Sequence, residues 1–216
     1  MDETEIITQT ISFVKHELAG AEGGHDWWHI HRVWKTSLLI AQTEAANSMV
    51  VQLAALLHDI ADSKFHNGDE SVGPVKAERF LKSSGIDPLI IKHVINIIEN
   101  ISYKGGNFKQ GFSSTELDIV QDADRLDAIG AIGIARAFNY GGHMGRQLYD
   151  PEVTPDLSMN KEQYKNSTSP TINHFYEKLL LLKDRMNTTT GKKLAEERHE
   201  FMLSYLEQFY REFEGQ

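Results

Sequence analysis

The sequence predicts an all-α fold organised as a single domain. Apolar residues recur at helical spacing in nearly every periodic segment, and no stretch alternates apolar and polar residues as a half-buried strand would. Start and stop signals such as Asp-Pro and Ser-Ser-Gly separate these segments. A chain of 216 residues with 40% hydrophobic residues has the size and apolar content for one domain with a sizeable core.

The first half of the chain contains five predicted helices. One carries apolar residues between positions 6 and 18, and a second begins near Asp26. The third, about 50–58, is apolar on almost every side, which is typical of a buried helix. Two amphipathic helices follow at about 72–81 and 89–98, the latter started by Asp87 as the cap and Pro88 at the first helical position.

The second half is predicted to contain a long helix over about 115–138 and two final helices over about 171–186 and 192–213. Between them, 140–170 holds several prolines and glycines and shows no sustained period, which predicts a long loop. Long loops in compact domains are usually functional or disordered. Both readings of this segment, a substrate lid or a disordered excursion, stay open.

Composition narrows the classes of function. The net charge of −9 and the lack of any basic run disfavour a nucleic-acid polymer as partner. Zero cysteines exclude disulfides, thiol catalysis and cysteine-based zinc sites. The acidic start is unlike a secretory signal and no apolar run is long enough to span a bilayer, so we expect a cytoplasmic protein with no membrane partner.

Histidines and aspartates are placed where a metal could satisfy them. His58 and Asp59 come directly after the apolar segment 53–57. Burying such groups without partners is costly, and coordination of one cation would satisfy both. Further donors stand in the segments 26–33 and 122–127. Imidazoles and carboxylates together suit borderline or hard divalent metals.

The motifs His-x-x-Arg-Val, Ala-Ala-Leu-Leu-His-Asp-Ile and Asp-Ala-Asp-Arg-Leu-Asp-Ala, in this order, resemble the HD superfamily of metal-dependent phosphohydrolases. The resemblance implies an HD-type helical fold with a metal-binding core at about 20–140 that holds a divalent ion (Mn, Mg, Co, Ni, Fe or Zn). A single ion is favoured, because Ile97-Ile98-Glu99-Asn100-Ile101 occupies the neighbourhood where an extra ligand would be expected. The motif register implies four metal ligands: His29, His58, Asp59 and Asp124.

Nearby residues compete for these roles. His25 lies one turn before His29 and is the reserve ligand, whereas His31 falls on a different helix face. The family's ligand is the second acid of the Asp-Ala-Asp motif, which selects Asp124, and Asp127 becomes a candidate outer-shell partner.

Asp62, one turn beyond His58, is the best-placed group to take a proton from water, so Asp62 and Asp59 are the predicted catalytic residues. Four cations are predicted to bind substrate phosphate: Arg32, Lys64, Lys104 and Arg125.

The segments 172–179 and 198–202 are similar to the C-terminal part of a bacterial subgroup, some of whose members cleave deoxynucleoside triphosphates to monophosphate and pyrophosphate. The resemblance therefore implies a small nucleotide as substrate. Alternatives are a nucleotide phosphomonoesterase or phosphodiesterase, a non-catalytic nucleotide sensor, and, less favoured, an iron oxygenase. Assembly into a homo-oligomer stays open.

Overall fold

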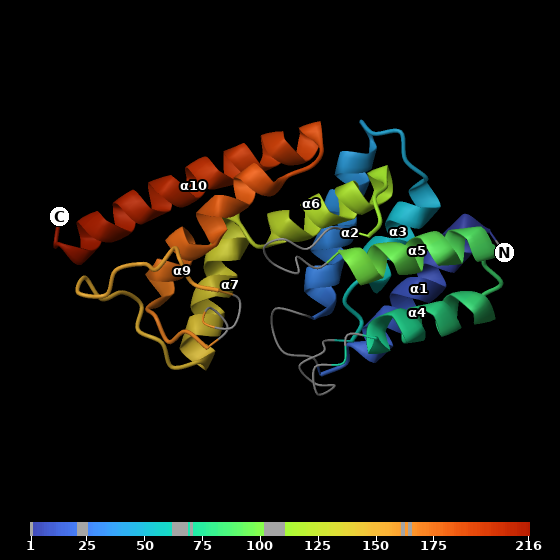
Figure 1. Ribbon diagram of the computed structural model, residues 1–216, viewed down its shortest axis with the longest axis horizontal. Coiled ribbons are helices and arrows are strands. Elements are labelled where there is room, and N and C mark those ends of the chain that lie inside the picture. The colour runs from blue at the N-terminus through green and yellow to red at the C-terminus, as the bar shows by residue number, and fades with distance from the viewer. Residues whose placement is uncertain are drawn as a thin grey trace. The chain divides into compact units, whose positions relative to one another are not determined.

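The computed structural model describes residues 2–20, 26–61, 69, 71–101, 111–160, 163 and 166–216, and these residues form helices, turns and loops without a strand (Figure 1). The all-α prediction is confirmed. The chain divides into two compact units, Met1–Asp124 and Arg125–Gln216. The single-domain organisation that the sequence suggested stays a prediction.

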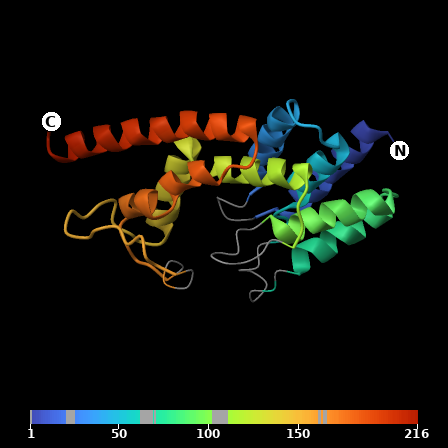
Figure 2. The same cartoon turned by 45° about the horizontal axis from the view of Figure 1, so that its top comes forward.

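In the first unit, α3 (Ser48–Leu57) is the central helix, as its uniformly apolar sequence predicted. It packs against α1 (Glu3–Glu17), α2 (Trp27–Ala41) and α5 (Pro88–Asn100), while α4 (Val72–Ser83) packs against α5 (Figures 1 and 2). Every apolar residue from position 50 to 57 is buried. Packing of α3 therefore fixes the positions of His58 and Asp59, which directly follow this helix.

Side-chain caps fix where these helices begin. The Asp26 carboxylate accepts a hydrogen bond from the amide of His29 at 3.0 Å, and Asn47 accepts one from Val50 at 3.2 Å. These caps satisfy amides that have no partner within the helix. The predicted start near Asp26 is thus confirmed, and its cap fixes the first turn of α2.

The predicted long helix 115–138 is wrong in one respect, because it is two helices. α6 (Thr115–Asp127) ends before Ile129, and α7 (Gly130–His143) begins with Gly130 at φ +74°. That conformation favours glycine, and a Cβ at this position would lie 3.0 Å from Cγ of Arg198. A Cβ on Gly133 would collide with the carbonyl of Ala128. The glycines therefore serve the turn between two helices.

The C-terminal helices also differ from the prediction. The segment 171–186 is a short α9 (Thr171–Glu177) followed by a 3-10 helix, η2 (Leu179–Arg185), because Lys178 leaves helical geometry with φ −144°. α10 (Thr189–Phe213) starts a few residues earlier than expected, with the Thr188 hydroxyl accepting a hydrogen bond from the amide of Gly191. α10 packs against α7 and η2 within the second unit.

The segment after α7 is held against α9 by several hydrogen bonds. The amides of Thr171 and Ile172 donate to the carbonyls of Gln147 and Leu148 at 2.9 and 3.0 Å. The Asn173 amide group donates to the Val153 carbonyl at 3.0 Å. Within the predicted loop, the part from Gln147 to Val153 is therefore attached to α9 in the second unit.

In the part of the chain that the structure describes, no helix combines the length and the apolar character that a bilayer crossing requires.

Candidate metal centre

Four side chains from three segments converge in the first unit. His29 comes from the first turn of α2, His58 and Asp59 follow the last turn of α3, and Asp124 lies on α6. The Nε2 atom of His29 lies 3.3 Å from Nε2 of His58, 3.9 Å from Oδ2 of Asp59 and 3.6 Å from Oδ1 of Asp124. Nε2 of His58 is also 3.9 Å from Oδ1 of Asp124. The structure thus brings together the four predicted ligands.

The orientation of His58 favours a metal-binding tautomer. Its Nδ1 atom lies 2.9 Å from the carbonyl oxygen of Ala55. A carbonyl can only accept, so Nδ1 carries the proton and the Nε2 lone pair points toward His29. Backbone carbonyls fix metal-binding histidines in this way in many sites.

Burial also favours neutral imidazole at this position. The side chains of His29 and His58 are only 3% and 4% exposed. Burial lowers the pKa of His58, which outweighs the opposing effect of the Asp124 carboxylate; the neighbouring His29 lowers the pKa further. A neutral imidazole is the form that binds a cation.

The donor set fits a divalent ion. Bonds of about 2.1 Å to nitrogen and oxygen place neighbouring ligand atoms roughly 3.0 to 3.4 Å apart in octahedral or tetrahedral geometry. The separations of 3.3 to 3.9 Å around His29 Nε2 are slightly wider, so a small contraction would suffice. His29, His58 and Asp59 each offer an atom within 4.8 Å of the others. Two carboxylates would offset the charge of a divalent cation.

A second polar cluster stabilises the N-terminal ends of α3 and α6, the ends away from His58 and Asp124. The amide of Asn47 donates to Oε1 of Glu116 at 2.8 Å, and Nε2 of His93 lies 3.4 Å from Oε2 of Glu116. His93 also contacts the hydroxyl of Ser114 at 2.9 Å, and that hydroxyl caps α6 by accepting from the amide of Leu117 at 3.1 Å.

Glu116, the partner of His93, was not among the residues predicted from the sequence to have a role. The only sequence signal was an acid in the first turn of a capped helix. The contact with Asn47 joins residues 69 positions apart, so it depends on the tertiary fold.

The residues that compete with the predicted metal ligands in sequence have different surroundings in the structure. The ring of His31 lies among those of Trp27, Trp28 and Trp34, with centroids 5.7 to 6.1 Å away. Burial, followed by the charges of Lys35 and Arg32, lowers the pKa of His31.

Asp122 is fully buried. Asp127 was a candidate outer-shell partner, and in the second unit its carboxylate forms an ion pair with Nη1 of Arg136 at 2.6 Å.

The predicted proton acceptor and substrate-binding residues are less well defined. Asp62, Lys64, Lys104 and the reserve ligand His25 lie outside the described residues. Arg32 lies on α2, one turn after His29.

Arg125 belongs to the second unit, and its Nη1 donates to the carbonyl of Arg185 at 2.5 Å. The roles of these residues in substrate binding and proton transfer stay predictions.

A family model for the HD domain matches residues 27–129, which include all four converging side chains. The chain belongs to the HD-domain superfamily of phosphohydrolases. It is 38% identical to YpgQ of Bacillus subtilis over 100% of this chain and 97% of that protein.

Similar solved structures cover nearly the whole chain. One is an HD-superfamily hydrolase from Bacillus thuringiensis, with 43% identity, a TM-score of 0.80 and 100% of both chains covered. Another is B. subtilis YpgQ in complex with ADP, with 38% identity and a TM-score of 0.74 over 98% of this chain and 97% of that one.

Proposed function

We propose that this protein is a metal-dependent hydrolase of small nucleotides that cleaves nucleoside triphosphates, deoxynucleotides included, to monophosphate and pyrophosphate. The observation that carries the proposal is the convergence of His29, His58, Asp59 and Asp124. One divalent ion bound there would polarise a phosphoryl oxygen and lower the pKa of a bound water. With nucleotides as substrates, the enzyme would act in the cytoplasm.

Each residue around the proposed metal site has a separate role in the proposed reaction. The Ala55 carbonyl holds His58 in the tautomer whose Nε2 faces the other donors. Burial lowers the pKa of His58 and so favours its neutral form, and the two carboxylates would supply the negative charge that retains a cation. In the proposed reaction Asp62 accepts the proton of the attacking water, while Arg32, Lys64, Lys104 and Arg125 bind phosphate oxygens.

The choice of a nucleotide has independent support. YpgQ, which matches nearly the full length of this chain, has been crystallised with ADP. The chain's net charge of −9 is unfavourable for a long polyanion, but a bound cation supplies local positive charge for a small one. We therefore propose a mononucleotide substrate and no polymer partner.

A substrate panel tests the proposal. Purified protein is incubated with nucleoside triphosphates, deoxynucleoside triphosphates, monophosphates and cyclic nucleotides, each with Mn, Mg, Co or Ni, and the products are separated. We expect pyrophosphate and a monophosphate from triphosphates. Orthophosphate from monophosphates would replace the proposal with a phosphomonoesterase. Nucleotide-dependent thermal stabilisation without any product would identify a sensor instead.

A further inference from the structure

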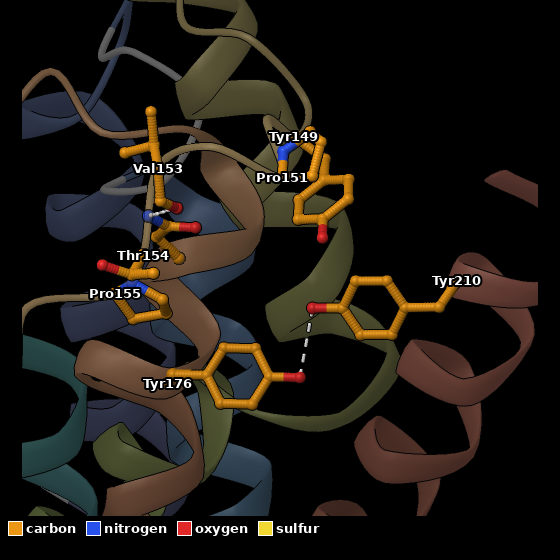
Figure 3. Close-up of a pocket in the computed structure, with 8 residues that line it drawn as sticks. Tyr149, Pro151, Val153, Thr154, Pro155, Tyr176 and Tyr210 are labelled. Atoms are coloured by element: carbon orange, nitrogen blue, oxygen red, sulfur yellow. Dashed lines mark hydrogen bonds between the residues drawn. The ribbon is translucent and has the colours of Figure 1, made fainter. Parts of the chain in front are cut away.

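A pocket of about 340 Å³ is lined by described residues of the second unit (Figure 3). One wall is the loop 149–155, and the others come from α9 and α10. We call it the tyrosine pocket, after three of its lining residues: Tyr149, Tyr176 and Tyr210. Its volume is at the lower end of the range for small-molecule sites.

The pocket is held open by contacts between its walls. The Asn173 side chain donates to the Val153 carbonyl at 3.0 Å, and the amide of Asp156 donates to Oε1 of Glu177 at 3.2 Å. These bonds attach the loop to α9 on either side of Thr154. On the other wall, the ring of Tyr149 packs edge-on against Tyr210, with centroids 5.3 Å apart. A ligand would meet walls that are already formed.

The lining is apolar and uncharged apart from a few polar groups. Val153 and Pro155 supply aliphatic surface across the pocket from Tyr210, and Pro151 lies beside Tyr149 (Figure 3). Among the described residues that line the pocket, none is acidic or basic. Burial, followed by the hydrogen bond with Tyr176, raises the pKa of Tyr210, so the Tyr210 hydroxyl stays protonated at neutral pH. The pocket is unsuited to a phosphate or another ion.

The polar groups gather at the tyrosine hydroxyls. The hydroxyl of Tyr176 lies 3.1 Å from that of Tyr210 (Figure 3). One hydrogen lies between the two oxygens, so the pair presents a second hydrogen and further lone pairs to a ligand. A ring with both donors and acceptors at its edge would complement this pair, and its faces would pack on aromatic and proline surfaces.

From these features we infer that the tyrosine pocket binds an uncharged, flat heteroaromatic molecule of nucleoside size. The inference does not depend on the proposed hydrolysis at the metal centre, because the lining residues belong to the second unit only. The pocket gives the protein a second binding site for a neutral ligand.

The test is calorimetric titration of the full chain, freed of metal by chelation, with adenosine, guanosine, thymidine and adenosine monophosphate. We expect at least one nucleoside to bind, and the charged monophosphate to bind more weakly because no cation lines the pocket. Thr154→Trp fills the pocket from an exposed loop position and should weaken nucleoside binding at least 10-fold, on the order expected for a blocked site. Leu157→Trp is the matched control: position 157 is 71% exposed and does not line the pocket.

A conservative variant protects the test against misfolding. Tyr176→Phe keeps the ring and removes one hydroxyl, so it should weaken nucleoside binding about 3- to 10-fold, the range for one hydrogen bond. Circular dichroism and melting temperature verify that each variant is folded. The inference is overturned if no nucleoside binds, if Thr154→Trp and Leu157→Trp bind equally well, or if binding requires metal and is lost in Asp59→Ala. The last result would assign the nucleoside to the metal centre.

Discussion

The metal centre and the tyrosine pocket are built from opposite chemistry. The centre gathers titratable side chains at helix termini and on one helix, with two imidazoles almost completely buried. The pocket gathers neutral rings from a loop and two helices around one pair of hydroxyls. The first set of side chains suits a cation, whereas the described lining of the second contains no charged residue. A nucleotide carries both kinds of chemistry, an anionic phosphate chain and a neutral base.

The sharpest test of this contrast is Asp124→Asn, which removes charge from the metal centre alone. We expect bound metal to fall well below one ion per chain and turnover to fall at least about 100-fold, since even outer partners of metal ligands are worth 10- to 100-fold. Nucleoside binding to the tyrosine pocket should persist. Elemental analysis, product assays and calorimetry measure the three quantities. Glu152→Gln, an exposed acid in the second unit, is the control; full metal content in Asp124→Asn would contradict the assignment.

Acidic pH should weaken the second unit through His174. Burial, followed by the charges of Lys178 and Arg146, lowers the pKa of His174 to about 4. Between this value and the ordinary value near 6.5, the unfolded chain binds a proton that the folded chain does not, so stability falls as pH falls through this window. The loss approaches about 3 kcal/mol.

Urea unfolding at several pH values, on wild type and His174→Gln, checks this prediction. The substitution should flatten the dependence between pH 6.5 and 4. His16→Gln removes a histidine whose side chain is 86% exposed, and should leave the dependence unchanged. Identical slopes in wild type and His174→Gln would show that another group is responsible.

In the first unit, Glu116→Ala should destabilise the fold by about 1 to 3 kcal/mol. The substitution leaves the Asn47 amide and His93 without the carboxylate that both contact. Metal affinity should fall as well, since His58 and Asp59 directly follow α3. Denaturant titrations and competitive metal binding measure both effects. Glu116→Gln retains an oxygen acceptor and should lose less; equal losses would attribute the effect to charge.

The smallest expected effect comes from the turn between α6 and α7. Gly130→Ala places a side chain at φ +74° and close to Arg198, and should cost about 1 to 2 kcal/mol of stability. The melting temperature should fall while metal content stays unchanged, because position 130 lies in the second unit. Gly142→Ala is the matched helical control, because a Cβ there meets open space. A loss of metal in Gly130→Ala would show that the two units are coupled.

The two sites also differ in how far the sequence could predict them. His29, His58, Asp59 and Asp124 stand in motifs whose spacing and helical context are recognisable from residue types alone. Because the two imidazoles are buried, a cation shared with the carboxylates would satisfy their lone pairs. The tyrosine pocket has no such signal, because Tyr149, Tyr176 and Tyr210 come together only when the loop lies against α9 and α10.

Helix boundaries followed the same rule. The starts at Asp26 and Asp87 were predictable because a local cap determines them. The break at Ile129 was not, because the helical period continues across it and a positive φ at Gly130 cannot be distinguished in sequence from close helix packing. The break at Lys178 likewise has no local marker. Helix ends determined by a local capping residue could be predicted from the sequence, whereas helix breaks determined by contacts with distant residues could not.

The polar cluster of Asn47, His93, Ser114 and Glu116 should couple substitutions at the two ends of α3. It lies at the N-terminal ends of α3 and α6, whereas the predicted ligand His58 follows the C-terminal end of α3 and the predicted ligand Asp124 lies near the C-terminal end of α6. A helix of ten residues is about 15 Å long and nearly rigid, so displacement of one end moves the other. Changes at Glu116 and at His58 should therefore be energetically coupled. A double-mutant cycle on metal affinity should yield a non-zero interaction energy, although Glu116 contacts the N-terminal end of α3 and His58 follows its C-terminal end.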